Sequence, residues 1–136
     1  MKQGKRVKPK FPIEYRLLIT RHYKERELKT VTLVAIRTVI EFTNFLYEII
    51  VEPILEAHSL HLKIHGLRAP QVSIPGTGPA KSATEFDDLK GHYIVTVTKP
   101  GGEENSFEVF ISRENVKVEK SPRKKFVDLV TTIEEW

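Results

Sequence analysis

The sequence contains no cysteine, one methionine and one tryptophan among its 136 residues. The lack of cysteine excludes disulfide bonds and thiolate metal ligands, although it does not fix the cellular compartment. No segment approaches the roughly 18 uninterrupted apolar residues of a membrane span, because charged residues interrupt the most apolar stretch. The basic N-terminal stretch is followed by neither the apolar core nor the small-residue cleavage site of a signal peptide. These absences predict a cytoplasmic protein without a membrane span.

A chain of this length usually forms one domain, and its hydrophobic fraction of 40% and charged fraction of 29% are ordinary for a globular protein. The net charge of +4 is unevenly distributed along the chain. Residues 1–10 hold five basic side chains and no acid, so residues 11–136 carry 4 − 5 = −1. The composition predicts a basic disordered tail at 1–10 and a single domain over 11–136.

Between residues 37 and 56, the charged side chains and one asparagine recur every three or four positions. At about 100° per residue, the first five of them lie within roughly 80° of arc, and apolar side chains fill most of the remainder. This spacing predicts a central amphipathic helix that begins near Arg37 and is kinked or ended by Pro53. A start near Lys24 is the alternative, but it would place Leu33 at the solvent-facing edge. The polar positions are Arg37, Glu41, Asn44, Glu48, Glu52 and Glu56.

Alternation of apolar and polar residues predicts several β-strands. It is clearest at 59–67, where Leu60, Leu62 and Ile64 face inward and the residues between them, including His61 and His65, face outward. The sequence KPGGEE supplies a hairpin turn between the strands that flank it. The predicted strands cover 14–22, 28–36, 59–67, 91–98 and 105–112, with a short edge strand at Val116 and Val118.

Two further segments complete the predicted fold. Residues 68–90 are rich in proline and glycine, which predicts a long irregular loop with at most one helical turn at 83–89. Ser121-Pro122 is a typical helix start, and apolar residues three and four apart predict a final helix to about Glu135. The element order β-β-α-β-loop-β-β(-β)-α predicts an α+β domain with a mostly antiparallel sheet, a central amphipathic helix and a C-terminal helix.

No motif specifies a metal, a cofactor or a catalytic centre. His61 and His65 share one strand face but stand about 13 Å apart, too far for one zinc ion. The stretch 74–84 resembles a phosphate-binding loop only superficially, since Pro75 and Ala80 occupy the two required glycine positions. What remains there is an anion contact through Lys81, Ser82 and Thr84. With no cysteine and no Gly-x-Ser-x-Gly elbow, the sequence disfavours an enzyme and predicts neither metal nor cofactor.

The leading functional hypothesis is a non-enzymatic module that associates with itself or with a protein partner. A helix apolar over two-thirds of its circumference needs more cover than one sheet face provides, and an uncovered remainder would form an interface. The expected interface residues are Phe42, Phe45, Tyr47 and Trp136.

Two alternatives belong to other classes of function. One is nucleic-acid binding through the basic N-terminal arm and a basic cluster at 117–125. The other is a small-ligand or enzymatic pocket under the 68–90 loop, lined by Lys81, Asp87 and His92. The basic residues that carry the first alternative are Lys2, Lys5, Arg6, Lys8, Lys10, Arg123, Lys124 and Lys125.

Overall fold

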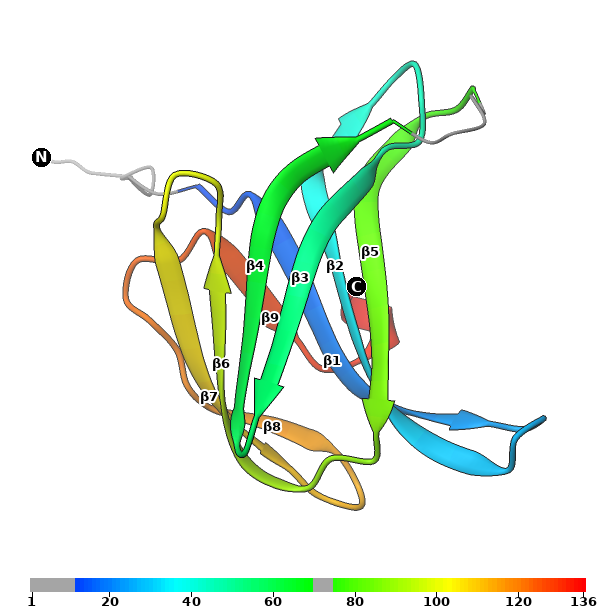
Figure 1. Cartoon of the computed structure of the whole chain (residues 1–136), viewed down its shortest axis with the longest axis vertical. Coiled ribbons are helices and arrows are strands. Elements are labelled where there is room, and N and C mark those ends of the chain that lie inside the picture. The colour runs from blue at the N-terminus through cyan, green and yellow to red at the C-terminus, as the bar shows by residue number, and fades with distance from the viewer. Residues whose placement is uncertain (1–11, 70–74) are drawn as a thin grey trace, which may run out of the picture.

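The computed structural model describes residues 12–69 and 75–136, and in these residues the chain is almost entirely β-structure (Figure 1). The predicted α+β fold is wrong: the described residues contain no α-helix, only a 3-10 turn at Ile133–Glu135. None of them forms a helix long and apolar enough to cross a bilayer. The strands are β1 Tyr15–Lys24, β2 Lys29–Phe42, β3 Glu48–Glu56, β4 Ser59–Arg68, β5 Gly78–Asp87, β6 Gly91–Thr98, β7 Glu104–Ile111, β8 Val116–Lys120 and β9 Val127–Val130.

All nine strands belong to one curved sheet in the order β8-β7-β6-β4-β3-β5-β2-β1-β9. Most neighbours are antiparallel, whereas β1 with β9 and β4 with β6 are parallel. The sheet curls into a nearly closed barrel-like shape (Figure 1). Between β3 and β5, which are also parallel, the only register pair is Glu48 with Lys81. The two strands diverge beyond that pair, so this junction is the weakly closed part of the sheet (Figure 1).

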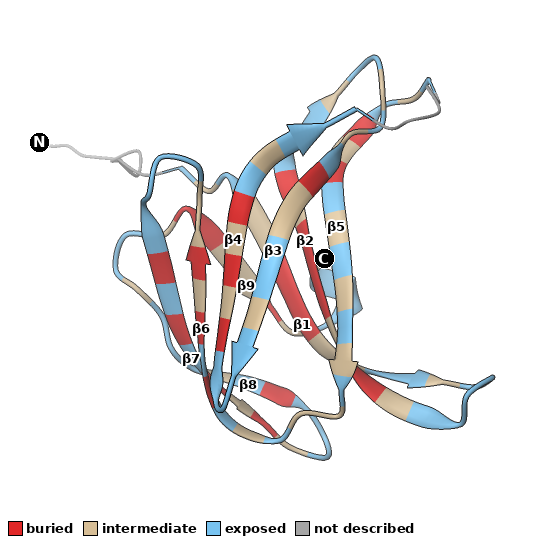
Figure 2. Ribbon diagram, in the orientation of Figure 1, coloured by how far each residue is buried: buried red, intermediate tan, exposed pale blue. Residues whose placement is uncertain are grey.

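Side chains on the inner face of the sheet form the main core. Buried and exposed positions alternate along β4, β6 and β7 (Figure 2), as expected for strands with one face inside. The predicted strand at 59–67 is confirmed as β4, with Leu60, Leu62 and Ile64 at most 3% exposed. The predicted turn between β6 and β7 is confirmed too, because Gly101 and Gly102 adopt positive φ angles there. The least exposed core side chains include Leu17, Ile19, Leu62, Val95, Val97, Phe107, Val109 and Val127.

The predicted central helix at 37–56 is instead the end of β2, a connection, and β3. The error has a simple geometric cause. Glu48, Glu52 and Glu56 are four residues apart, which is about one helical turn but also two full repeats of a strand. All three therefore lie on the outer face of β3, whereas Ile49 between them is buried. Pro53, awkward inside a helix, is acceptable in β3 because this strand pairs with β4 on one side only at that position.

The predicted C-terminal helix is also wrong, because β9 and the short 3-10 turn occupy that stretch. The strand carries apolar side chains on both faces. Val127 packs in the main core, whereas Val130 packs with Leu18 and Ala35 in a small cluster on the opposite face. A strand buried on both faces loses its alternation, so its apolar residues fell at spacings typical of a helix.

The predicted irregular loop at 68–90 contains a ten-residue strand, β5, which pairs antiparallel with β2. The helical turn predicted at 83–89 is absent for the same reason. Gly78 and Pro79 occupy the first two positions of β5, so the breaker residues mark the start of a strand. Pro79 is compatible with a strand there because it is the second residue of β5 and lies next to an irregularity in the pairing with β2.

Candidate functional site: a charged row and groove on the outer face

Charged side chains stand in register across six neighbouring strands on the outer face of the sheet. Three consecutive members, Arg16, Arg37 and Lys81, are positive, and we call them the cation row. Neighbouring strands lie about 4.8 Å apart, so each of these residues stands directly beside the next. The full row, in strand order from β9 to β4, is Asp128, Arg16, Arg37, Lys81, Glu48 and Arg68.

Like charges placed directly opposite each other on adjacent strands are unfavourable, so each member of the cation row needs compensation. Arg37 finds it in the main-chain carbonyl oxygen of Trp136, to which its Nε and Nη2 donate at 3.0 and 2.6 Å. Burial, reinforced by the neighbouring Arg16, lowers the pKa of the Arg37 guanidinium from its ordinary value. The guanidinium also lies 5.5 Å from the centre of the Trp136 ring, a cation–π distance.

Arg16 is only partly compensated. Its Nη1 donates to the same Trp136 carbonyl oxygen at 3.4 Å, and its Nε lies 3.5 Å from a carboxylate oxygen of Asp128. That Nε is buried and has no hydrogen-bond partner among the described residues. Both arginines thus donate to the same oxygen of Trp136.

Lys81 is the member of the row that remains available. It is exposed, and it makes no ion pair or hydrogen bond with any residue in the described ranges. Its other neighbour in the row, Glu48, turns toward Arg68, whose Nη2 lies 2.8 Å from the Glu48 carboxylate. An unpaired ammonium group beside Arg37 is suited to receiving an anion.

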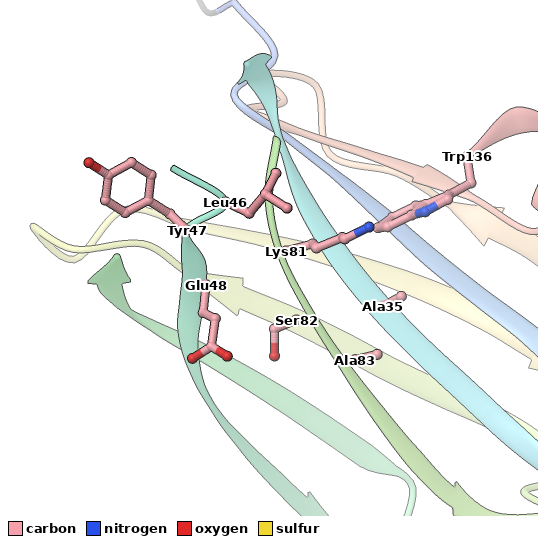
Figure 3. A pocket seen from close by; sticks show the side chains of 8 residues that line it. All are labelled: Ala35, Leu46, Tyr47, Glu48, Lys81, Ser82, Ala83 and Trp136. Carbon is pink, nitrogen blue, oxygen red and sulfur yellow. The ribbon is translucent and has the colours of Figure 1, made fainter. Parts of the chain in front are cut away.

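A pocket of about 520 Å³ adjoins the Lys81 side chain (Figure 3). Its walls come from the connection before β3 and from the segment that carries Trp136, while β2 and β5 provide the floor. In Figure 3, the Lys81 side chain is directed toward the Trp136 indole, and Leu46 faces it from the opposite wall. The lining residues are Ala35, Leu46, Tyr47, Glu48, Lys81, Ser82, Ala83 and Trp136.

A second pocket, of about 270 Å³, continues the first toward β4. The two share Glu48, Lys81, Ser82 and Ala83, and the second adds Ile49 and Arg68. We call the two together the outer groove. It runs across the strands, parallel to the charged row, from an apolar end at Trp136 to a polar end at Arg68.

Both walls of the outer groove are held by packing. The Trp136 side chain packs against the apolar cluster of Leu18, Ala35 and Val130. On the opposite wall, Leu46 occupies space beside Gly76 and Gly78, where an added Cβ would lie only 3.1 and 3.3 Å from its carbons. Glycine at these two positions therefore lets the connection before β3 lie close to β5.

The predicted interface residues separate into two groups. Tyr47 stacks edge-on with Phe42 and Phe45, at ring distances of 5.1 and 6.2 Å, so these three form one cluster. Trp136 belongs to the opposite wall of the groove, and in Figure 3 the Tyr47 ring points away from it. Whether either group contacts a partner stays a prediction.

Of the residues predicted to contact an anion, Lys81 and Ser82 line the outer groove and Thr84 does not. Thr84 pairs with Val34, a main-core residue, and so lies on the inner face. The proposed pocket of Lys81, Asp87 and His92 is not assembled, because Asp87 lies six residues from Lys81 along β5, about 20 Å away.

The other predicted groups lie away from the groove. The basic residues at 2–10 fall outside the described residues, and Arg123, Lys124 and Lys125 lie in the connection between β8 and β9. Each outward histidine of β4 and β6 makes one side-chain hydrogen bond: His61 with Thr98, His65 with Glu52, and His92 with Glu119. Within 12–69 and 75–136, no three histidine or acidic residues gather as a metal site would require.

Sequence reasoning missed Arg16 and Arg37 as site residues. They are 21 positions apart in sequence, and Lys81 is a further 44 positions away, so only the strand register brings the three together. Comparison with protein-family models, with curated proteins and with solved structures found no match for this chain.

Proposed function

We propose that this protein is a non-enzymatic binding module whose outer groove takes an anionic ligand with a flat, apolar body. The observation that carries the proposal is the cation row, in which Lys81 stands in register beside Arg37 with no anionic partner of its own in the described chain. A bound anion would offset the repulsion within the row.

The shape and lining of the groove support the proposal that the ligand has an apolar body. A volume of about 520 Å³ lies within the range of small-molecule sites. The Trp136 indole and the Leu46 side chain offer surfaces for a ring or an acyl chain, while Lys81 would meet the charged end. Binding is favoured over catalysis because no histidine lines the groove to activate the Ser82 hydroxyl.

The test uses the fact that Trp136 is the sole tryptophan and lines the groove. The probe is 8-anilinonaphthalene-1-sulfonate, which combines a sulfonate with a flat apolar body and accepts energy from tryptophan. We expect saturable energy transfer from Trp136, and about tenfold weaker binding in Lys81→Ala, since a hydrogen bond to a charged group contributes about 1.5–3 kcal/mol.

The matched control is Lys117→Ala, which removes an exposed lysine of β8 and should leave the affinity unchanged. The uncharged analogue N-phenyl-1-naphthylamine should bind more weakly than the sulfonate. Added salt should reduce this difference in affinity between the two probes. Equal affinity of the unaltered protein and Lys81→Ala for the sulfonate, or equal affinity for the charged and uncharged probes, would exclude an anion site at Lys81.

A further inference from the structure

The junction between β3 and β5 leaves two strand edges without a partner strand. Beyond the single pair of Glu48 and Lys81, residues 49–56 of β3 and 82–87 of β5 have no register partners across the junction. We call this part of the sheet the seam. A strand antiparallel to β5 could pair along the free edge of β5 and lie against β3.

Two inward-facing side chains beside the seam remain partly exposed, which indicates that a further strand could cover them. Leu55 of β3 is paired with Leu60 of β4 and faces the same side, yet Leu55 is 38% exposed whereas Leu60 is 2% exposed. Phe86, on the inner face of β5, packs on the main core but is only partly buried. A strand lying in the seam with apolar inward residues would cover both side chains.

The outward side chains that flank the seam are predominantly acidic. Glu52 and Glu56 lie on the outer face of β3, and Glu85 and Asp87 on that of β5. Glu52 contacts His65 and Glu85 pairs with Lys24, whereas no ion pair of Glu56 or Asp87 occurs among the described residues. A strand in the seam should therefore carry basic residues on its outward face.

We propose that the seam accepts residues 6–11 of a second copy of this chain as an added strand. In this stretch, Arg6, Lys8 and Lys10 alternate with Val7, Pro9 and Phe11. An extended chain with this sequence presents three cations on one face and an apolar row on the other, which matches the acidic rim and the uncovered inner side chains.

A second copy is the occupant because of where the described chain begins. Pro12 lies beside Lys99 and Phe126, and in the sheet order β1, β2 and β5 stand between it and the seam. Exchange of identical segments between two copies satisfies both seams at once and gives a closed, symmetric dimer.

The test measures self-association of the full chain by sedimentation velocity and light scattering at concentrations up to about 300 µM. We expect a dimer whose affinity falls with added salt. The double variant Glu56→Lys/Asp87→Lys should weaken the dimer about tenfold or more, because two attractive cross-strand charge pairs become repulsive. The control is Glu25→Lys/Glu114→Lys, which makes the same charge change at exposed residues outside the seam.

Exchanging the charges on the two sides of the contact tests whether the dimer forms at the seam or at another surface. Lys8→Glu/Lys10→Glu should weaken the dimer as well, and combining it with Glu56→Lys/Asp87→Lys should restore association. A protein that is monomeric throughout the concentration range would overturn the proposal. So would a dimer that none of these variants affects. A monomer in which the β5 amides that do not bond to β2 are protected from exchange would also overturn it, since this would mean an occupant from its own chain.

Discussion

Asn105 offers the most direct test of how the last strand is held in the sheet. Its side chain is 3% exposed, and its Oδ1 accepts hydrogen bonds from the main-chain N–H groups of Phe126 and Val127 at 2.8 and 3.1 Å. Its Nδ2 donates to the carbonyl oxygen of Lys124 at 3.0 Å. One side chain therefore satisfies three main-chain groups that lead into β9, on the edge opposite to β1.

The substitution Asn105→Ala would leave two buried N–H groups without an acceptor. Each such group costs about 1–3 kcal/mol, so we expect the free energy of unfolding to fall by about 3 kcal/mol. For a chain of this size, that is about 10 °C in Tm. Urea unfolding followed by Trp136 fluorescence and by circular dichroism gives the value directly.

Asn115→Ala is the matched control, because Asn115 lies in the exposed turn between β7 and β8 and only its main chain is bonded there. It should change the free energy of unfolding by less than about 0.5 kcal/mol. A loss below about 1 kcal/mol for Asn105→Ala, or a loss equal to that of the control, would refute the role assigned to this side chain.

Two further predictions concern stability and the sheet edge. Arg21 donates to both carboxylate oxygens of Asp88, at 3.1 and 2.9 Å, and thereby lowers the pKa of Asp88. This stabilisation is present above the unfolded pKa and is lost as the pH falls through the depressed value. Asp88→Asn should therefore be less stable at pH 7, by a difference that narrows as the pH falls below about 4. Urea midpoints at pH 7 and pH 3 measure this difference, and a pH-independent difference would contradict the assignment. Pro53→Thr should restore an N–H donor to the β3 edge and promote aggregation on storage, which light scattering measures. The control Pro100→Thr, in a turn, should not increase aggregation.

The sequence predicted strands where one face is buried and the other exposed, as at Leu60, Leu62 and Ile64. It failed where spacing was ambiguous or alternation was lost. Glutamates four residues apart on β3 fit both periodicities. β9 carries apolar residues on both faces, because Val130 packs in a second cluster on the outer side. Pro53, inside the last turns of the predicted helix, was the signal that an edge strand would have explained better.

The outer groove could be predicted only in fragments. Lys81 and Ser82 stood out in sequence because they followed a glycine- and proline-rich stretch, and Trp136 because it is the sole tryptophan. Their placement around one pocket depends on pairings between β1, β2, β3 and β5, and those registers are set by the whole sheet. Local sequence patterns do not show which distant strand lies alongside a given strand. The cation row could therefore not be predicted from the sequence.

The pairing of β1 with β9 has a consequence for how the chain acquires its structure during synthesis. Tyr15 stands beside Val127, so during synthesis β1 must wait for more than a hundred further residues before its neighbour β9 exists. Contacts this distant along the chain make folding slow, and the waiting strand presents an open hydrogen-bonding edge throughout. Pairing with β2 across the first hairpin covers only the opposite edge of β1, so the edge that receives β9 stays open until β9 has been made.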